Sequence, residues 1–318
     1  MSNTNGHTHT PVLLTEVIDG LRLQADGIYM DCTFGRGGHT RALLDRLGPH
    51  GRVVAIDRDP QAVAAGRALA AEDPRLSVEH ANFDRVGRVA SEYDVAGKVG
   101  GMLFDLGVSS PQLDDVTRGF SFQQDGALDM RMNQSADESA AQWLASADDE
   151  EIARVLRDYG EERHARRIAR AIVAKRAVEP IATTRRLADI VAAAQPRSAG
   201  RRGARLKHPA TRTFQAIRIH INGEMQALDA ALEQVPDILT VGGRLAVISF
   251  HSLEDRRVKR FIRAHSRGPT APKGMPVVPD GAPAVLRPVG KAIRAGSDEV
   301  GRNPRARSAV LRIAERRP

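Results

Sequence analysis

The sequence predicts an α/β fold in which an all-helical insertion interrupts an open, largely parallel sheet. Between residues 28 and 105, short apolar runs alternate with helical patterns, which is typical of parallel strands joined by crossover helices. Residues 136–194 then show helical periodicity without a strand pattern, and apolar runs return at residues 243–250 and 309–314. We therefore expect a sheet domain of residues 1–113 and 209–318 and a helical insertion of residues 114–208.

Each expected element follows from a local pattern. Strands are expected where short apolar runs end at a carboxylate or a turn, at residues 28–30, 52–57, 76–80, 100–105 and 243–250. Helices are expected where apolar residues recur at helical spacing, at residues 12–21, 40–47, 60–72, 136–145, 148–158, 162–177, 185–194 and 209–234. The run at 309–314 is expected to be an antiparallel strand at the edge of the sheet.

A glycine-rich turn follows the first strand. Asp31 ends that strand, and Gly35, Gly37 and Gly38 lead directly into a helical pattern. This layout is typical of a nucleotide-binding crossover, where a side chain would hold the ligand away from the backbone. Asp57 ends the second strand about 20 residues further on, where a carboxylate accepts hydrogen bonds from the ribose hydroxyls of an adenosine.

The glycine spacing indicates which adenosine cofactor is bound. A pyrophosphate cradle needs a third glycine at the helix start, and this chain lacks it. The carboxylate of Asp31 would repel a phosphate but could hold an ammonium group. S-adenosylmethionine has an adenosine, an ammonium group and a sulfonium and no phosphate, so it is the expected cofactor.

Two further strand ends carry candidate residues. Phe83 follows the third strand and could stack on the adenine ring, although a core aromatic is an equally good interpretation. Asp105 ends the fourth strand. Because ligands bind beyond the carboxyl ends of parallel strands, Asp31, Asp57 and Asp105 are expected on one edge of the sheet. Burying carboxylates there costs free energy unless they are paired, which favours a functional role.

Basic residues are concentrated in two segments. Residues 154–212 and residues 255–318 each contain 16 Lys or Arg and 5 Asp or Glu, whereas the net charge of the whole chain is +8. This distribution indicates a polyanionic partner; a solvated charged face is the alternative. The residues expected to contact phosphate are Arg201, Arg202, Arg205 and Lys207, in a glycine-spaced loop, and Arg305 and Arg307.

Two other segments are candidates for substrate contact. Residues 118–132 interleave aromatic and charged residues, which is typical of a loop over a site, although an ordered packing loop has the same composition. His251 follows the fifth strand and either contacts substrate or makes a hydrogen bond in a turn.

Composition excludes several classes of protein. The chain has 318 residues and one cysteine, Cys32, so it has no internal disulfide and fits a reducing cytoplasm. It has no run of about 18 apolar residues, so we expect neither a membrane span nor a membrane partner. Residues 1–10 are polar and are not expected to be a secretory signal. The sequence assigns no metal ligand.

Eight ordered blocks cover the chain from about residue 9 to its end. They are HTPVLL from His9, TFGRGGHT from Thr33, DLGVSSPQLD from Asp105, RGFSF from Arg118, LDMRM from Leu128, FQAIRIHIN from Phe214, SFHSLED from Ser249 and NPRAR from Asn303. Together these blocks resemble the RsmH (MraW) family of bacterial 16S ribosomal RNA cytosine-N4 methyltransferases.

The resemblance implies a Rossmann-like class I methyltransferase sheet and an S-adenosylmethionine-dependent enzyme. Its implied reaction methylates the exocyclic N4 amine of a single cytosine in the decoding region of 16S rRNA. The implied partner is 16S rRNA or the assembled small ribosomal subunit, and a homodimer is left open. The family's cofactor contacts fall on Gly37, Gly38, His39, Asp57, Phe83, Asp105 and Gln112.

Asp105 is the expected proton acceptor for the reacting amine, because related amino-methyltransferases place a polar residue after the fourth strand. Those enzymes usually have Asp or Asn followed by Pro-Pro and an aromatic residue there, whereas this chain has Asp-Leu-Gly-Val. A role of Asp105 toward the cofactor alone is therefore left open. Cys32 lies at the cofactor end, which argues against C5 methylation, since that reaction needs a cysteine nucleophile beside the base.

Two other functional classes share part of this pattern. A nicotinamide-dependent dehydrogenase would share the acidic Asp57, but the missing third glycine and the basic segments count against it. A non-catalytic assembly factor that binds ribosomal RNA would share the basic segments, and a methyl-transfer assay separates it from an enzyme.

Overall fold

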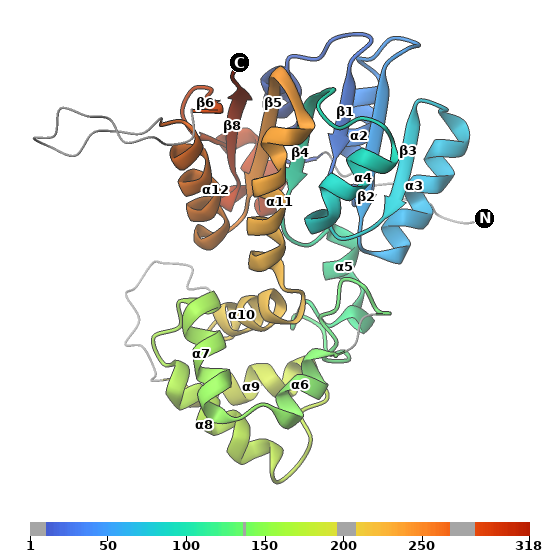
Figure 1. The fold of residues 1–318 in the computed structure, drawn as a ribbon. Coiled ribbons are helices and arrows are strands. Elements are labelled where there is room, and N and C mark those ends of the chain that lie inside the picture. The colour runs from blue at the N-terminus through green and yellow to red at the C-terminus, as the bar shows by residue number, and fades with distance from the viewer. Residues whose placement is uncertain (1–10, 136–137, 196–207, 268–283) are drawn as a thin grey trace, which may run out of the picture. The chain divides into compact units, whose positions relative to one another are not determined.

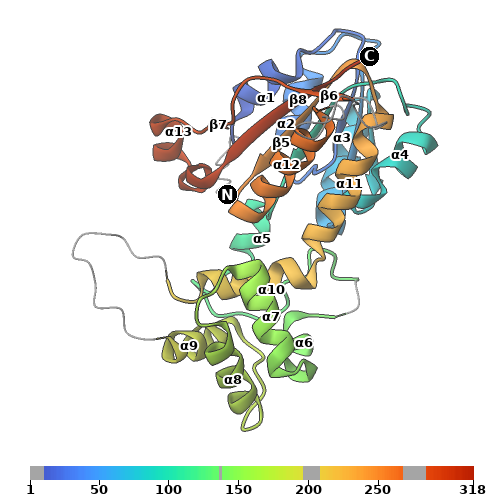
Figure 2. The same cartoon turned by 60° about the vertical axis from the view of Figure 1, so that its left-hand side comes forward.

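The computed structural model describes residues 11–135, 138–195, 208–267 and 284–318. The chain divides into two compact units (Figures 1 and 2). The first, called here the sheet unit, comprises Met1–Gly107 and Gln226–Pro318. The second, called the helical unit, comprises Val108–Met225.

The sheet unit contains an eight-stranded sheet with the strand order β3-β2-β1-β4-β5-β8-β6, and β7 pairs with β8. The first five strands in this order are parallel, and β8 is antiparallel to β5. The strands are β1 (Ile28–Asp31), β2 (Arg52–Asp57), β3 (Leu76–His80), β4 (Val99–Asp105), β5 (Leu239–Ser249), β6 (Leu286–Pro288), β7 (Ile293–Arg294) and β8 (Val310–Arg316). The predicted α/β fold with a largely parallel sheet is therefore confirmed.

One prediction about the last strand is wrong. β8 runs antiparallel as expected, but it is not an edge strand, because β6 and β7 pair with its other side. These two strands have only three and two residues, and β6 contains Pro288. A proline cannot donate to a ladder and is tolerated at a sheet edge, where β6 lies.

Helices cover both faces of the sheet because successive side chains along each strand point to opposite faces. On β2, Val53 and Ala55 belong to an apolar core that also includes residues of α1 (Leu14–Leu21), α2 (Gly38–Leu44) and α3 (Pro60–Glu72). Val54 and Ile56 belong to a second core, with residues of α4 (Val86–Glu92), α11 (Glu224–Ile238) and α12 (Ser252–His265). Two apolar cores thus hold the parallel strands, and the carboxyl ends of these strands share one edge.

The helical unit has its own apolar core, which includes Trp143, Leu156, Ile168 and Leu187. Side chains of Ser139, Asp148 and Thr183 cap three of its helices by accepting hydrogen bonds from backbone N–H groups, which stabilises the helix starts. Its helices are α5 (Ser110–Asp114), α6 (Ala140–Ser146), α7 (Asp149–Gly160), α8 (Ala165–Arg176), α9 (Thr184–Ala194) and α10 (Thr211–Ile221).

The long helix predicted over residues 209–234 is two helices in the structure. α10 ends at Ile221, Gly223 has a φ of +57°, and α11 begins at Glu224. A left-handed residue ends a helix, and glycine adopts this conformation without a side-chain penalty. Because Phe214 and Ile217 pack in the helical core, α10 belongs to the helical unit. The units therefore divide at Gly107 and Gln226, whereas the sequence placed the boundaries at 113 and 209.

Among the described helices, none combines the length and the apolar character that a membrane span requires.

Candidate cofactor site at the sheet edge

The turn after β1 is shaped by its glycines and fastened to β2. Gly35 and Gly37 have φ angles of +56° and +72°, which strain any residue with a side chain. A Cβ atom on Gly37 would lie 2.6 Å from the Phe34 ring. The backbone N–H of Gly35 donates to Asp57 Oδ2 at 2.7 Å. The turn is therefore fastened beside the end of β2, and its approach to a ligand stays a prediction.

Asp57 is a partly buried carboxylate at the end of β2. Its Oδ2 accepts from Gly35, and its Oδ1 accepts from the N–H of Asp59 at 2.8 Å. Burial raises the pKa of Asp57 to about 6; the two N–H donors lower it, and the nearby charges of Asp59 and Asp31 raise it. Each carboxylate oxygen has a further lone pair, so the group can also accept from two ligand hydroxyls.

Asp31 is buried at the end of β1 and already has two donors. Thr40 Oγ1 donates to its Oδ2 at 2.6 Å, and the N–H of Thr33 donates to its Oδ1 at 3.2 Å. Burial raises its pKa, and the hydrogen bond from Thr40 acts in the opposite direction. Asp31 therefore fastens the glycine turn to α2, and its contact with an ammonium group stays a prediction.

Asp105 ends β4 and faces a buried histidine. Its N–H donates to Thr33 Oγ1 at 2.6 Å, and His39 Nε2 lies 3.5 Å from its Oδ2. Burial alone would lower the pKa of His39, but the close approach of the Asp105 carboxylate and the charge of Asp31 outweigh it, so the pKa is raised. Asp105 Oδ1 has no hydrogen-bond partner among the described residues, and it is free to accept from a ligand.

Phe83 begins a short 3-10 helix after β3, Phe83–Arg85. Its ring meets that of Phe104 edge to face, with the centroids 5.9 Å apart, so Phe83 packs against the core. Its side chain is only partly buried, and its stacking on adenine stays a prediction. Gln234 of α11 holds the segment by donating to the carbonyl of Asp84 at 2.8 Å and accepting from the N–H of Gly87 at 3.0 Å.

These residues form one acidic edge with a glycine turn, a histidine and an aromatic ring, which is the chemistry that an adenosine cofactor bearing positive charge requires. A model of the MraW methylase family matches residues 6–317.

The chain belongs to the MraW methylase family.

Methyl transfer in the MraW methylase family depends on S-adenosylmethionine. Solved structures with low similarity include an rRNA methylase from Streptococcus thermophilus, with 13% identity, a TM-score of 0.40 and coverage of 96% of this chain and 93% of that one. Another is a 1,6-didemethyltoxoflavin-N1-methyltransferase from Burkholderia thailandensis with bound S-adenosylhomocysteine, with 12% identity, a TM-score of 0.40 and coverage of 96% and 76%. Similarities this low carry no argument about this chain.

The remaining predicted site residues of this MraW methylase chain are distributed over both units. Gln112 lies on α5 in the helical unit, where its Oε1 accepts from the N–H of Ser109 at 2.9 Å. Arg305 and Arg307 are exposed on the 3-10 helix Pro304–Ser308. The predicted phosphate contacts Arg201, Arg202, Arg205 and Lys207 lie outside the described residues.

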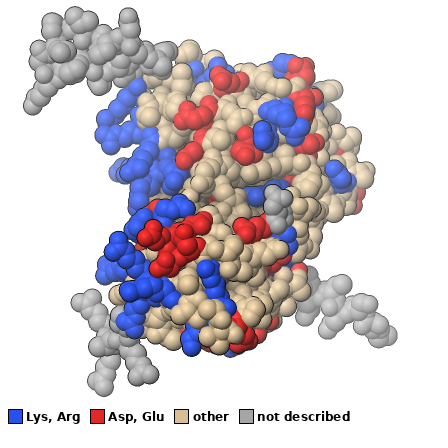
Figure 3. All heavy atoms as spheres, turned by 60° about the horizontal axis from the view of Figure 1, so that its bottom comes forward, with Lys and Arg blue, Asp and Glu red and all other residues tan. Residues whose placement is uncertain are grey.

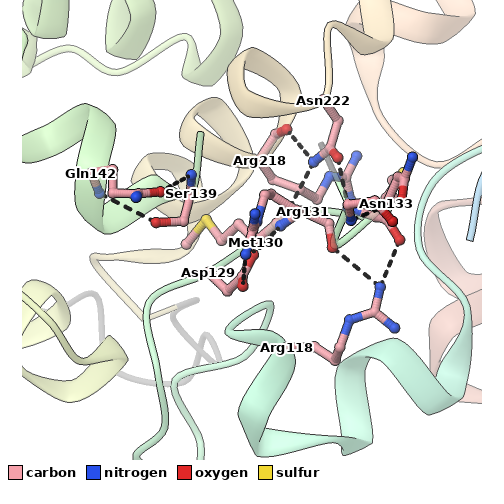
Figure 4. A network of polar contacts seen from close by, with 11 residues as sticks. Arg118, Asp129, Met130, Arg131, Asn133, Ser139, Gln142, Arg218 and Asn222 are labelled. Atoms are coloured by element: carbon pink, nitrogen blue, oxygen red, sulfur yellow. Dashed lines mark hydrogen bonds and ion pairs between the residues drawn. The ribbon is translucent and has the colours of Figure 1, made fainter. Parts of the chain in front are cut away.

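The loop of residues 118–132 is held by a buried polar network that sequence reasoning missed (Figure 4). Asn222 Nδ2 donates to the carbonyl of Met130 at 2.7 Å, and Asn222 Oδ1 accepts from the N–H of Met132 at 2.8 Å. Arg118 donates to the carbonyls of Arg131 and Met132 at 3.1 and 2.8 Å. The sequence predicts Asn222 on the polar stripe of a long helix. Gly223, directly after it, is the only sequence signal that the helix ends there, at the position where Asn222 is buried.

We expect Asn222→Ala to loosen this loop. The substitution leaves the Met130 carbonyl and the Met132 N–H without their partner, and each unsatisfied buried group costs about 1–3 kcal/mol. Amide hydrogen exchange across residues 118–132 should therefore accelerate by at least about tenfold. Gln123→Ala is the matched control, since this side chain in the same loop is exposed and makes no hydrogen bond within the described part of the chain. Equal exchange rates in both variants would show that the network does not hold the loop.

Proposed function

We propose that this chain methylates the exocyclic N4 amine of one cytosine in the decoding region of 16S rRNA, with S-adenosylmethionine as the methyl donor. The family membership supports the methyl transfer and the cofactor. The observation that carries the choice of an amine substrate is the unpaired Oδ1 of Asp105 at the end of β4. This oxygen can accept a hydrogen bond from an amine N–H, and a thiolate nucleophile for carbon methylation is absent from the described part of the edge.

The residues of the sheet edge fit the cofactor, whose chemistry is an electrophilic methyl group on a sulfonium. Asp57 would accept from the two ribose hydroxyls, and Phe83 would stack on the adenine. The glycine turn would let the backbone approach the ligand. Asp31 would favour the ammonium group, and together the carboxylates would offset the positive charge of the donor.

Asp105 has the central role in the proposed reaction. The N4 lone pair of cytosine is delocalised into the ring, so the amine is a weak nucleophile and needs alignment and an acceptor. Asp105 Oδ1 would accept the N–H while His39 holds Oδ2. The reaction forms an N–CH3 bond, breaks the S–CH3 bond and releases one N–H proton, and Asp105 is the base that receives it.

Cys32 supports nitrogen rather than carbon as the methylated atom. Methylation at cytosine C5 needs a cysteine thiolate that adds to the ring. Cys32 is the only cysteine of the chain, and it is buried. Burial raises the pKa of its thiol well above the ordinary value, and the charge of Asp31 raises it further. A thiol in this environment stays protonated at neutral pH and is a poor nucleophile.

Two features support ribosomal RNA as the substrate, namely the resemblance to the family and the basic residues. Of these basic residues, Arg305 and Arg307 are exposed. Their 3-10 helix leads directly into β8, and Val310 of β8 pairs with Ser249 at the end of β5. Because β5 is parallel to β4, these arginines lie at the edge where Asp105 lies. Phosphates bound there would bring a neighbouring base toward the acidic residues.

The decisive assay measures methyl transfer from S-adenosylmethionine to purified small ribosomal subunits and to free 16S rRNA that lack the modification. We expect one N4-methylcytosine in the decoding region, located by mass analysis of RNA fragments. Transfer to carbon, to another base or to neither substrate would contradict the proposal. The comparison of the two substrates shows whether the assembled subunit is required.

A further inference from the structure

Helix α12 presents a row of exposed cations on the side that turns away from the sheet. Its buried side chains include Leu253, Val258, Phe261 and Ile262, which pack in the core beneath. Figure 3 shows Lys and Arg side chains gathered on its left-hand side, the side on which α12 lies in Figure 1. The exposed cations of α12 are Arg256, Lys259, Arg260 and Arg263, and they are called here the α12 row.

Acidic side chains near α12 are already paired with other cations. Asp229 pairs with Arg257 at 3.2 Å, Glu233 lies 3.7 Å from His265, and Asp255 pairs with Arg312 at 2.7 Å. Within the described part of the chain, Lys259, Arg260 and Arg263 make no ion pair. The positive charges of Lys259, Arg260 and Arg263 are therefore not neutralised by an ion pair in this part of the chain, and an external anion would gain from them.

The geometry of the row suits a repeating anion. Positions 256, 260 and 263 are three or four residues apart, so these side chains follow one another at about 4.5–6 Å along the helix axis. No exposed residue of α12 is aromatic, so this helix offers no side chain that could stack on a base. A chain of phosphates matches such a row, and contacts to phosphates carry no base sequence information.

The α12 row begins close to the acidic edge of the sheet. α12 begins at Ser252, directly after β5 ends at Ser249. β5 is the parallel neighbour of β4, whose last residue is Asp105. The row therefore starts near the acidic edge and runs away from it along the sheet unit.

We propose that the α12 row is a binding track for the phosphate backbone of the RNA that flanks the methylated base. This inference rests on the proposed function for the identity of the RNA. It assigns to α12 a sequence-independent contribution to affinity, separate from the recognition of the base at Asp105.

The test compares Lys259→Gln/Arg263→Gln with Arg46→Gln/Arg67→Gln in the full chain. The control pair removes the same charge from two exposed arginines of the segments that pack on the opposite face of the sheet. Binding to a 16S rRNA fragment that spans the decoding region is measured by fluorescence anisotropy over a series of salt concentrations. Each lost phosphate contact lowers the slope of log affinity against log salt by about 0.7–0.9, so the α12 pair should lower it by about 1.4–1.8.

We expect this decrease in the salt slope for the Lys259→Gln/Arg263→Gln variant and not for the control. The affinity of the variant for the cofactor should equal that of the unmodified chain. At saturating subunits the rate of methyl transfer should be unchanged, and the KM for subunits should rise. An unchanged slope would overturn the proposed track. The same conclusion holds if the Lys259→Gln/Arg263→Gln variant binds RNA normally but loses binding to vesicles of anionic phospholipid. A lowered slope in a protein that methylates another base would leave the track standing and refute the proposed function.

Discussion

Asp105→Ala is expected to lower the rate of methyl transfer by about 10²–10⁴-fold, the range that a positioned general base contributes. The substitution removes the acceptor for the N4 proton and leaves His39 without its carboxylate partner, which lies 3.5 Å away. Single-turnover kinetics at saturating S-adenosylmethionine measure this effect on the chemical step, because they are independent of product release.

The same variant decides between the two roles that the sequence left open for Asp105. If this carboxylate serves only the cofactor, the variant binds S-adenosylmethionine more weakly, but saturating cofactor restores the rate. Isothermal titration of the cofactor separates these cases. Asp105→Asn is the matched variant, since it keeps the size of the side chain and removes its charge. A rate near that of the unmodified chain in both variants would rule out the proposed acceptor.

The affinity for S-adenosylmethionine is expected to fall by about tenfold between pH 8 and pH 5. Burial raises the pKa of Asp57 to about 6, so the carboxylate is ionised at pH 8 and mostly protonated at pH 5. Ribose hydroxyls donate to the ionised form, and protonation removes one of its acceptor sites. Below the pKa of Asp57 in the cofactor-free protein, each pH unit therefore costs about tenfold in affinity. Above that pKa the affinity becomes constant.

Asp57→Asn is the control for this pH dependence. The amide has no proton to gain in this range, so its affinity for the cofactor should be low at both pH values and should show no step near pH 6. Calorimetric titration in buffers of matched ionic strength gives both curves. A step of the same size in the Asn variant would assign the pH dependence to another group.

The parallel sheet and its acidic edge could be predicted because their signals are local. β1, β2 and β4 are short apolar runs that end at a carboxylate, and the pairing places Asp31, Asp57 and Asp105 at the same edge. Parallel strands joined by crossover helices leave few other arrangements for such a sequence. The glycine turn was equally readable, because only glycine tolerates the φ angles found at Gly35 and Gly37.

The features that sequence reasoning missed depend on contacts between distant residues or on very short elements. The hydrogen bond from Asp105 to Thr33 joins residues 72 positions apart, and the pair of His39 and Asp105 has no periodic signature. The break at Gly223 was hidden because apolar spacing continues on both sides of it, and an isolated glycine is compatible with a helical pattern. The left-handed conformation of Gly223 separates the two helices, and the packing of α10 in the helical core assigns α10 to the helical unit.

The most direct test of this account is a crystal structure of the chain with bound S-adenosylmethionine. We expect the ribose hydroxyls within hydrogen-bond distance of Asp57, the adenine on the Phe83 ring and the methyl group on the side of Asp105. A cofactor bound among the helices between residues 140 and 194, or one whose ribose has no contact with Asp57, would contradict the central claim.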